Sequence, residues 1–130
     1  MKRLNPDTLL KPQAYTQVVE AAGRRTIFVS GQISQDAQGT VVAPGDFPGQ
    51  ARQVFANLRA ALQAAGASPA DITKMTTFIV DYTPELRAVI AEARSEFLSG
   101  APPPASTLIG ISALADPAYL LEIEAIAVID

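Results

Sequence analysis

The sequence has no cysteine, no histidine and no tryptophan among its 130 residues. Without cysteine there is no thiol nucleophile, and without histidine there is neither a Ser-His-Asp triad nor an imidazole general base. The usual Cys/His zinc site is excluded as well, so we expect no metal. Any enzyme built on this chain must use carboxylates, Lys, Arg, Tyr, Ser, Thr, backbone groups or bound water.

Charge is also scarce, and its balance is acidic. Charged residues make up 18% of the chain, and the formal net charge is −3. Sequence-independent nucleic-acid binders need a basic surface, so we expect no nucleic-acid partner. The mean hydropathy of +0.19 indicates an exterior that is apolar for a globular protein. Apolar exteriors favour contacts between subunits.

Long hydrophobic runs are missing too. No segment has the apolar length of a membrane span, and the first residues, Met1 to Pro6, lack the apolar core of a signal peptide. Together with the absence of cysteine, this predicts a cytoplasmic protein with no membrane contact. The length suits one domain covering residues 1–130.

Hydrophobic periodicity predicts an α+β fold. Alternating or β-branched runs predict strands over 2–4, 15–21, 25–33, 72–80, 105–111 and 120–129, with 15–21 and 25–33 forming a hairpin around Gly23. Apolar residues at helical spacing predict helices over 47–65, capped by Asp46 and Gly66, and from Thr83-Pro84 to about Gly100. The order β-β-β-α-β-α-β-β predicts a mixed sheet with two helices on one face.

The last strand carries two carboxylates on a face that is otherwise apolar. Side chains alternate along a strand, so Glu122 and Glu124 share one face with Ile126 and Val128. These glutamates either lie on a solvated edge or pair with arginine at an interface, or one of them is a general acid/base or an amine anchor in a subunit cleft. The two helices can cover only one face, so the apolar remainder of this face predicts a symmetric homo-oligomer.

Other candidates have a structural and a functional interpretation. Ser30-Gly31 is either a β-bulge or a close approach of the backbone to a ligand, and Tyr15 belongs either to the core or an interface or to a site. Arg94 lies at the edge of the second helix's apolar stripe. It is either a solvated arginine paired with Glu92 or Glu96, or a cation that reaches a site.

Five segments together resemble the reactive-intermediate deaminase family (Rid, YjgF-like). The similarity covers nearly the whole chain and rests on Ala14-Tyr15-Thr16-Gln17, Val29-Ser30-Gly31-Gln32-Ile33, the run from Gln50 to Leu58, Pro104-Ala105-Ser106-Thr107, and the run from Glu122 to Val128. The resemblance implies a chorismate-mutase-like α+β fold and a homotrimer whose three sheets form a central barrel. It also implies a small-molecule cleft at each subunit interface and a reaction that needs no cofactor.

The resemblance also assigns residues to that cleft. It implies Glu122 as the catalytic carboxylate, and Tyr15, Ser30, Gly31 and Leu108 as ligand contacts. The deaminase branch reads Pro-Ala-Arg-Ser at the β-strand motif, and its arginine grips the substrate carboxylate.

In this chain Ser106 stands at the arginine position, and a hydroxyl cannot replace a guanidinium fork. The second helix of the family borders the cleft, so Arg94 is the candidate for the missing charge. The family's asparagine on that helix aligns loosely with Ala91.

Three functions follow from these expectations. The first is a cofactor-free trimeric enzyme that hydrolyses a small imine or enamine, with Glu122 orienting water or carrying a proton, and with little activity as a 2-imino acid deaminase. The second is a non-catalytic binder of small molecules in the same cleft. The third is the ribonuclease or translation inhibitor activity attributed to some relatives, which the acidic composition and the absence of histidine oppose.

Overall fold

The computed structural model describes residues 1–130 and confirms the predicted order of strands and helices. A short 3₁₀ helix (η1) precedes the fourth strand. The elements are β1 (Lys2–Leu4), β2 (Val18–Glu20), β3 (Arg25–Gln32), α1 (Phe47–Ala64), η1 (Pro69–Asp71), β4 (Ile72–Val80), α2 (Pro84–Leu98), β5 (Ala105–Ile111) and β6 (Leu121–Ile129).

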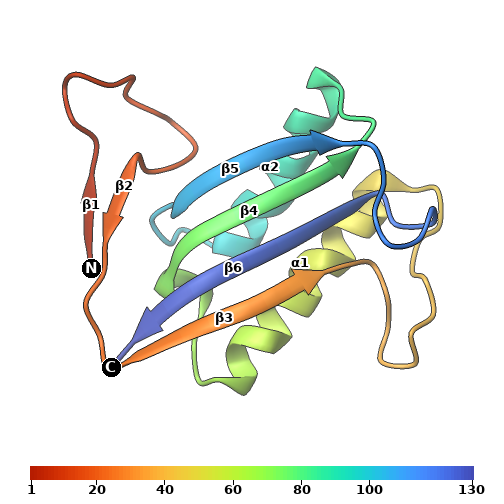
Figure 1. Ribbon diagram of the computed structural model, residues 1–130, viewed down its shortest axis with the longest axis horizontal. Helices are drawn as coiled ribbons and strands as arrows, with labels where there is room; N and C mark the ends of the chain where they lie inside the picture. The colour runs from red at the N-terminus through yellow and green to blue at the C-terminus, as the bar shows by residue number, and fades with distance from the viewer.

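Four strands form the main sheet, in the order β3-β6-β4-β5. β6 runs antiparallel to both of its neighbours, and β4 and β5 are parallel. Both helices lie behind one face of this sheet (Figure 1). The two edges of the sheet are therefore β3 on the α1 side and β5 on the α2 side.

The local sequence explains where the helices begin and end. The Asp46 side chain accepts a hydrogen bond from the Gly49 amide at 3.1 Å, which caps α1. Gly66 follows the last turn with φ +76, a left-handed conformation that glycine adopts without strain. α2 begins with Pro84 at its first position and ends at Leu98, followed by the cap residue Ser99 with φ 50.

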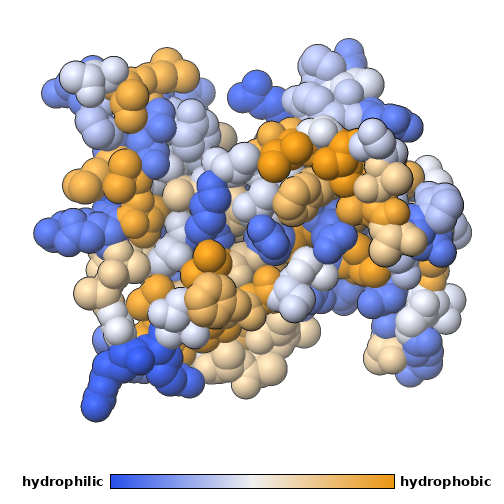
Figure 2. Space-filling view, in the orientation of Figure 1, coloured by the Kyte–Doolittle hydropathy of each residue, from blue (hydrophilic) through white to orange (hydrophobic).

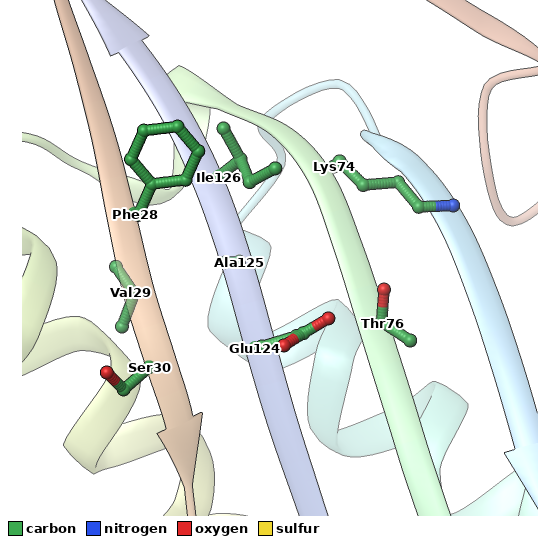
Figure 3. Close-up of a pocket in the computed structure, with 8 residues that line it drawn as sticks. All are labelled: Phe28, Val29, Ser30, Lys74, Thr76, Glu124, Ala125 and Ile126. Carbon is green, nitrogen blue, oxygen red and sulfur yellow. The ribbon is translucent and has the colours of Figure 1, made fainter.

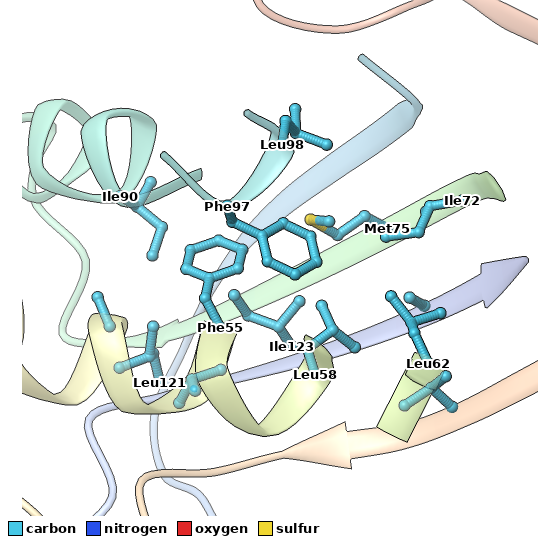
Figure 4. Close-up of a cluster of buried hydrophobic side chains, with 14 of the residues drawn as sticks. Phe55, Leu58, Leu62, Ile72, Met75, Ile90, Phe97, Leu98, Leu121 and Ile123 are labelled. Atoms are coloured by element: carbon cyan, nitrogen blue, oxygen red, sulfur yellow. The ribbon is translucent and has the colours of Figure 1, made fainter. Parts of the chain in front are cut away.

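The core lies between the helices and the sheet. Phe55 of α1 and Phe97 of α2 pack against each other (Figure 4), with their ring centroids 4.9 Å apart. The Arg59 guanidinium covers the Phe97 ring at 5.2 Å from its centroid. Leu121 and Ile123 of β6 are fully buried beneath them. This packing fixes which face of β6 points to the helices, and so places the glutamates on the opposite face.

The predicted hairpin between residues 15–21 and 25–33 is wrong. β2 is only Val18–Glu20, and it pairs with β1 in a separate two-stranded sheet beside the main one (Figure 1). The Thr16 amide donates to the Pro104 carbonyl, and the Gln17 amide donates to Asn5 Oδ1. These bonds use backbone donors that a longer strand would need.

The face of the sheet away from the helices is not covered by any other element of the chain. Figure 2 shows this face, where apolar and polar side chains are interspersed. Phe28 on β3 is 75% exposed and Ile109 on β5 is 39% exposed. No helix of the chain combines the length and the hydropathy of a membrane span.

Candidate functional site

The two glutamates of β6 lie on the helix-free face, as strand alternation predicts. Leu121, Ile123 and Ala125 are buried beneath the helices, while Glu122 is half-buried and Glu124 is exposed. β6 is a central strand, so neither glutamate lies on a sheet edge. That excludes the simplest structural interpretation, in which the pair belongs to a solvated edge strand.

Glu122 reaches from β6 to the neighbouring strand at Gly31. The pairing of β3 with β6 shifts register between Val29 and Gln32, so the Ser30-Gly31 segment forms the predicted irregularity. A Cβ atom built on Gly31 would lie 2.8 Å from Glu122 Cγ and would collide with the carboxylate. Glycine at position 31 therefore gives the Glu122 side chain room to lie over the β3 backbone.

A second group of predicted residues lines a cavity at the opposite edge of the sheet. Tyr15, Arg94, Ser106 and Leu108 all lie around it, in a hollow of about 620 Å³ between α2, β5 and the segment before β2. Ser106 and Leu108 are on the helix side of β5, because their neighbour Thr107 bonds to Lys74 on the other side. The remaining lining residues are Ala14, Tyr82, Pro84, Arg87, Ala88, Ile90 and Ala91.

This cavity is positively charged. Arg87 and Arg94 line it, and no aspartate or glutamate does. Burial lowers the pKa of the Arg94 guanidinium from its ordinary value, and the positive charge of Arg87 lowers it further. The two ion pairs of the structure lie elsewhere, between Lys2 and Glu20 and between Lys11 and Asp7. Arg94 therefore has neither Glu92 nor Glu96 as an ionic partner.

A second hollow, of about 260 Å³, lies on the helix-free face. Phe28 and Ile126 stand side by side at one end, and Ser30, Thr76 and Glu124 lie further along (Figure 3). The Lys74 side chain points away from Glu124, toward β5, where its amine bonds to Thr107 Oγ1 at 2.5 Å. Glu124 thus belongs to a different surface from the cavity that Arg94 lines.

Within one chain the predicted residues form two groups that do not meet. Glu122 and Gly31 come together on the helix-free face beside the β3 edge, with Ser30 next to them. Tyr15, Arg94, Ser106 and Leu108 come together behind the β5 edge. β6 and β4 separate the two edges. One cleft containing all seven residues therefore requires two copies of the chain.

Sequence reasoning missed Arg87 and Tyr82, which line the cavity with the predicted residues. Arg87 precedes Arg94 by seven residues, a spacing that puts both on one side of a helix. That spacing is a signal that the sequence contained. No three His, Cys, Asp or Glu side chains gather in a way that could hold a metal ion.

The sequence is similar to a known protein family and to several of its members. A family model described as "Endoribonuclease L-PSP" matches residues 7–129. A protein of Dermatophagoides farinae named 2-iminobutanoate/2-iminopropanoate deaminase is 32% identical over 126 residues, which cover 95% of this chain and 94% of that protein. A RutC family protein of Pyrococcus horikoshii is 35% identical over 113 residues, covering 87% of this chain and 85% of the relative.

Solved structures of related proteins have the same fold as this chain. A protein of unknown function of the Rid family, YyfB from Yersinia pestis, superposes with a TM-score of 0.93 and 38% identity, over 98% of each chain. TdcF of E. coli, crystallised with bound serine, superposes with a TM-score of 0.71 and 35% identity, over 94% of this chain and 91% of that one.

Proposed function

The chain belongs to the Rid (YjgF, L-PSP) family, and from that premise we propose that it hydrolyses a small imine or enamine in a cleft between subunits. The observation that carries the proposal is the division of the predicted residues between the two sheet edges. A homotrimer that joins the β3 edge of one copy to the β5 edge of the next brings Glu122 and Gly31 to the partner's cavity.

The chemistry needs only a carboxylate and water. Glu122 accepts a proton from water while the hydroxyl adds to the carbon of the protonated imine, C=NH2⁺, which gives a neutral carbinolamine. The same carboxylic acid then returns the proton to the nitrogen. The C–N bond breaks, ammonia leaves, and the carbonyl product forms with the loss of the hydroxyl proton. Backbone groups at Ser30-Gly31 and the Tyr15 side chain supply hydrogen bonds that orient the substrate, and no cofactor takes part.

Substrate binding in this chain differs from that of the deaminases, because we place it in a branch without the arginine of the β5 motif. Ser106 offers the cavity one hydroxyl where the deaminases have a guanidinium. Arg94 lines the same cavity from α2 and supplies the positive charge. We expect weak turnover of the imine derived from 2-aminoacrylate, because losing a charged carboxylate contact costs on the order of 2–4 kcal/mol, about 30- to 1,000-fold in rate.

A non-catalytic binder in the same cleft is the second candidate, and the Ser106 position favours it. The two functions share the cleft and differ only in whether Glu122 moves protons. A ribonuclease, as the name of the matching family model suggests, has less support, because the chain is acidic and has no histidine.

The test compares Glu122→Gln with Glu124→Gln. Imines are generated in situ from several 2-amino acids by an amino acid oxidase with catalase, and imine loss and ammonia release are followed against the uncatalysed rate. We expect Glu122→Gln to lower turnover by about 10²- to 10⁴-fold, the usual contribution of a general acid/base. Glu124→Gln should keep most of the activity, since Glu124 is exposed and Glu122 is the glutamate that lies against Gly31.

Ligand binding by calorimetry separates the two candidate functions. A cleft that binds carboxylate metabolites but accelerates none of the imines would support the binder. If Glu124→Gln proved the more damaging change, the assignment of the catalytic carboxylate would be wrong.

A further inference from the structure

Two arginines enter the same cavity, and the proposed reaction uses only one of them. Arg87 and Arg94 both line the hollow between α2 and β5. Their spacing of seven residues separates them by about 10 Å along the helix axis, at about 1.5 Å per residue. The side chains can therefore hold two groups at different ends of one ligand.

Nothing within one chain neutralises this pair, and the proposed cleft adds a single carboxylate, Glu122 of the partner subunit, against two guanidinium groups. The cavity has no acidic lining residue, and neither arginine takes part in an ion pair. Like charges repel each other, and Arg94 is half-buried while Arg87 is exposed, so it is the Arg94 guanidinium that loses most of the water that would screen its charge. Such an arrangement favours a ligand that brings negative charge to both arginines.

We propose that the natural substrate is a small molecule with two carboxylates, namely the imine of a dicarboxylic 2-oxo acid, with one carboxylate held by Arg94 and the other by Arg87. This inference rests on the proposed function, because it treats the cavity as the substrate half of the cleft. The planar guanidinium fork matches a carboxylate through two parallel hydrogen bonds, so each arginine selects one such group.

The size of the cavity agrees with a ligand longer than a three-carbon imine. The hollow measures about 620 Å³ and has Ala88 and Ala91 on the α2 wall between the two arginines. These short side chains leave room for a carbon chain along the helix. Tyr15 and Ser106 on the opposite wall offer hydroxyl groups to the polar end of the ligand.

The experiment measures affinity with stable probes by calorimetry at low salt. The probes are butyrate, succinate, glutarate and inorganic phosphate, which separate one carboxylate, two carboxylates at two spacings, and a compact dianion. We expect succinate or glutarate to bind at least tenfold more tightly than butyrate and phosphate. Arg87→Gln should bring the dicarboxylate affinity down to that of butyrate, and it should weaken the dicarboxylates by a larger factor than it weakens butyrate.

Arg94→Gln should weaken both classes of carboxylate. Arg24→Gln is the matched control, because it removes the same charge from an exposed turn outside the cavity and should change neither affinity. Arg87→Lys keeps the charge without the fork and should give an intermediate affinity, with circular dichroism and sedimentation showing that each variant is folded.

Equal affinity for butyrate and the dicarboxylates, or an unchanged dicarboxylate affinity in Arg87→Gln, would overturn the inference. Tighter binding of phosphate than of either dicarboxylate would overturn it in favour of a phosphate ester. The proposed hydrolytic activity can be disproved independently of the inference about the ligand. A chain that binds dicarboxylates through Arg87 but releases no ammonia from a dicarboxylic imine keeps the inference about the ligand and loses the proposed activity.

Discussion

At position 31, a single missing methyl group determines where a carboxylate lies. Glu122 lies over the Gly31 backbone in space that a Cβ atom would fill. The atoms in the way belong to the flexible end of a side chain, so a methyl group there displaces the carboxylate and leaves the strand in place. Glycine is thus required at this position for the geometry of the site more than for the stability of the fold.

Gly31→Ala is therefore expected to lower turnover to nearly the level of Glu122→Gln, while the free energy of unfolding changes by no more than about 1 kcal/mol. Steady-state kinetics and urea denaturation measure the two effects. In the double variant with Glu122→Gln, the second change should add little, since both remove the same group. Fully additive losses would show that Gly31 and Glu122 act independently.

At the scale of elements, a buried glutamine joins α1 to the start of β6. Gln50 is 0% exposed, and its Nε2 atom donates to the Ala118 carbonyl at 2.9 Å. The Leu120 amide donates to Gln50 Oε1 at 3.0 Å. The side-chain amide thus satisfies one acceptor and one donor of the segment that leads into the strand carrying both glutamates.

Gln50→Ala should destabilise the fold by about 2–4 kcal/mol, because it leaves a buried amide and carbonyl unpaired and opens a cavity. Urea denaturation at fixed protein concentration measures the loss. Gln63→Ala is the control, since Gln63 lies on the same helix but is exposed, and it should change stability by less than about 0.5 kcal/mol. Equal losses in the two variants would contradict the role given to Gln50.

The elements with strong local signals were predictable, and the pairing of strands was not. The bounds of β4 matched the prediction, and those of α1 differed by one residue, because periodicity and the caps at Asp46 and Gly66 define them locally. The pattern around Val18–Glu20 shows a strand but not its partner. Hydrogen bonds from the Thr16 amide to the Pro104 carbonyl and from the Gln17 amide to the Asn5 side chain set its length, and the first joins residues far apart in the sequence.

The candidate site likewise has features that the sequence predicts and features that depend on the fold. Alternation along β6 was enough to place Glu122 and Glu124 on the face away from Leu121. The distance between Glu122 and Ser106 was not predictable, because it depends on the strand order β3-β6-β4-β5. Arg87 lay within reach of sequence reasoning through its seven-residue spacing from Arg94, but only the fold shows that both face one cavity.

At the scale of the whole molecule, the chain leaves one sheet face and two sheet edges without cover. Apolar residues occur at both edges, with Phe28 on β3 and Ile109 on β5. Beside the β3 edge, Ala61 and Ala64 of α1 and the following Ala65 border a further hollow of about 420 Å³. Two different edges that meet each other form a heterologous interface, which closes into a ring when the rotation between copies is one third of a turn.

Sedimentation equilibrium at micromolar concentration should therefore give the mass of a trimer for the wild type. A charge introduced at either edge, as in Phe28→Asp or Ile109→Asp, should dissociate the ring, because each change buries a carboxylate without a partner. Ala60→Asp on the exposed side of α1 is the control and should leave the trimer intact.

Mixing the two edge variants tests the head-to-tail arrangement itself. Phe28→Asp keeps an intact β5 edge and Ile109→Asp keeps an intact β3 edge, so the equimolar mixture has one undamaged pair of edges. We expect the mixture to contain a heterodimer and no trimer, since the remaining edges of that dimer both carry the new charge. It should also recover one active cleft for every two chains, which ammonia release measures. A monomeric wild type, or a mixture that regains neither mass nor activity, would show that the β3 and β5 edges do not join.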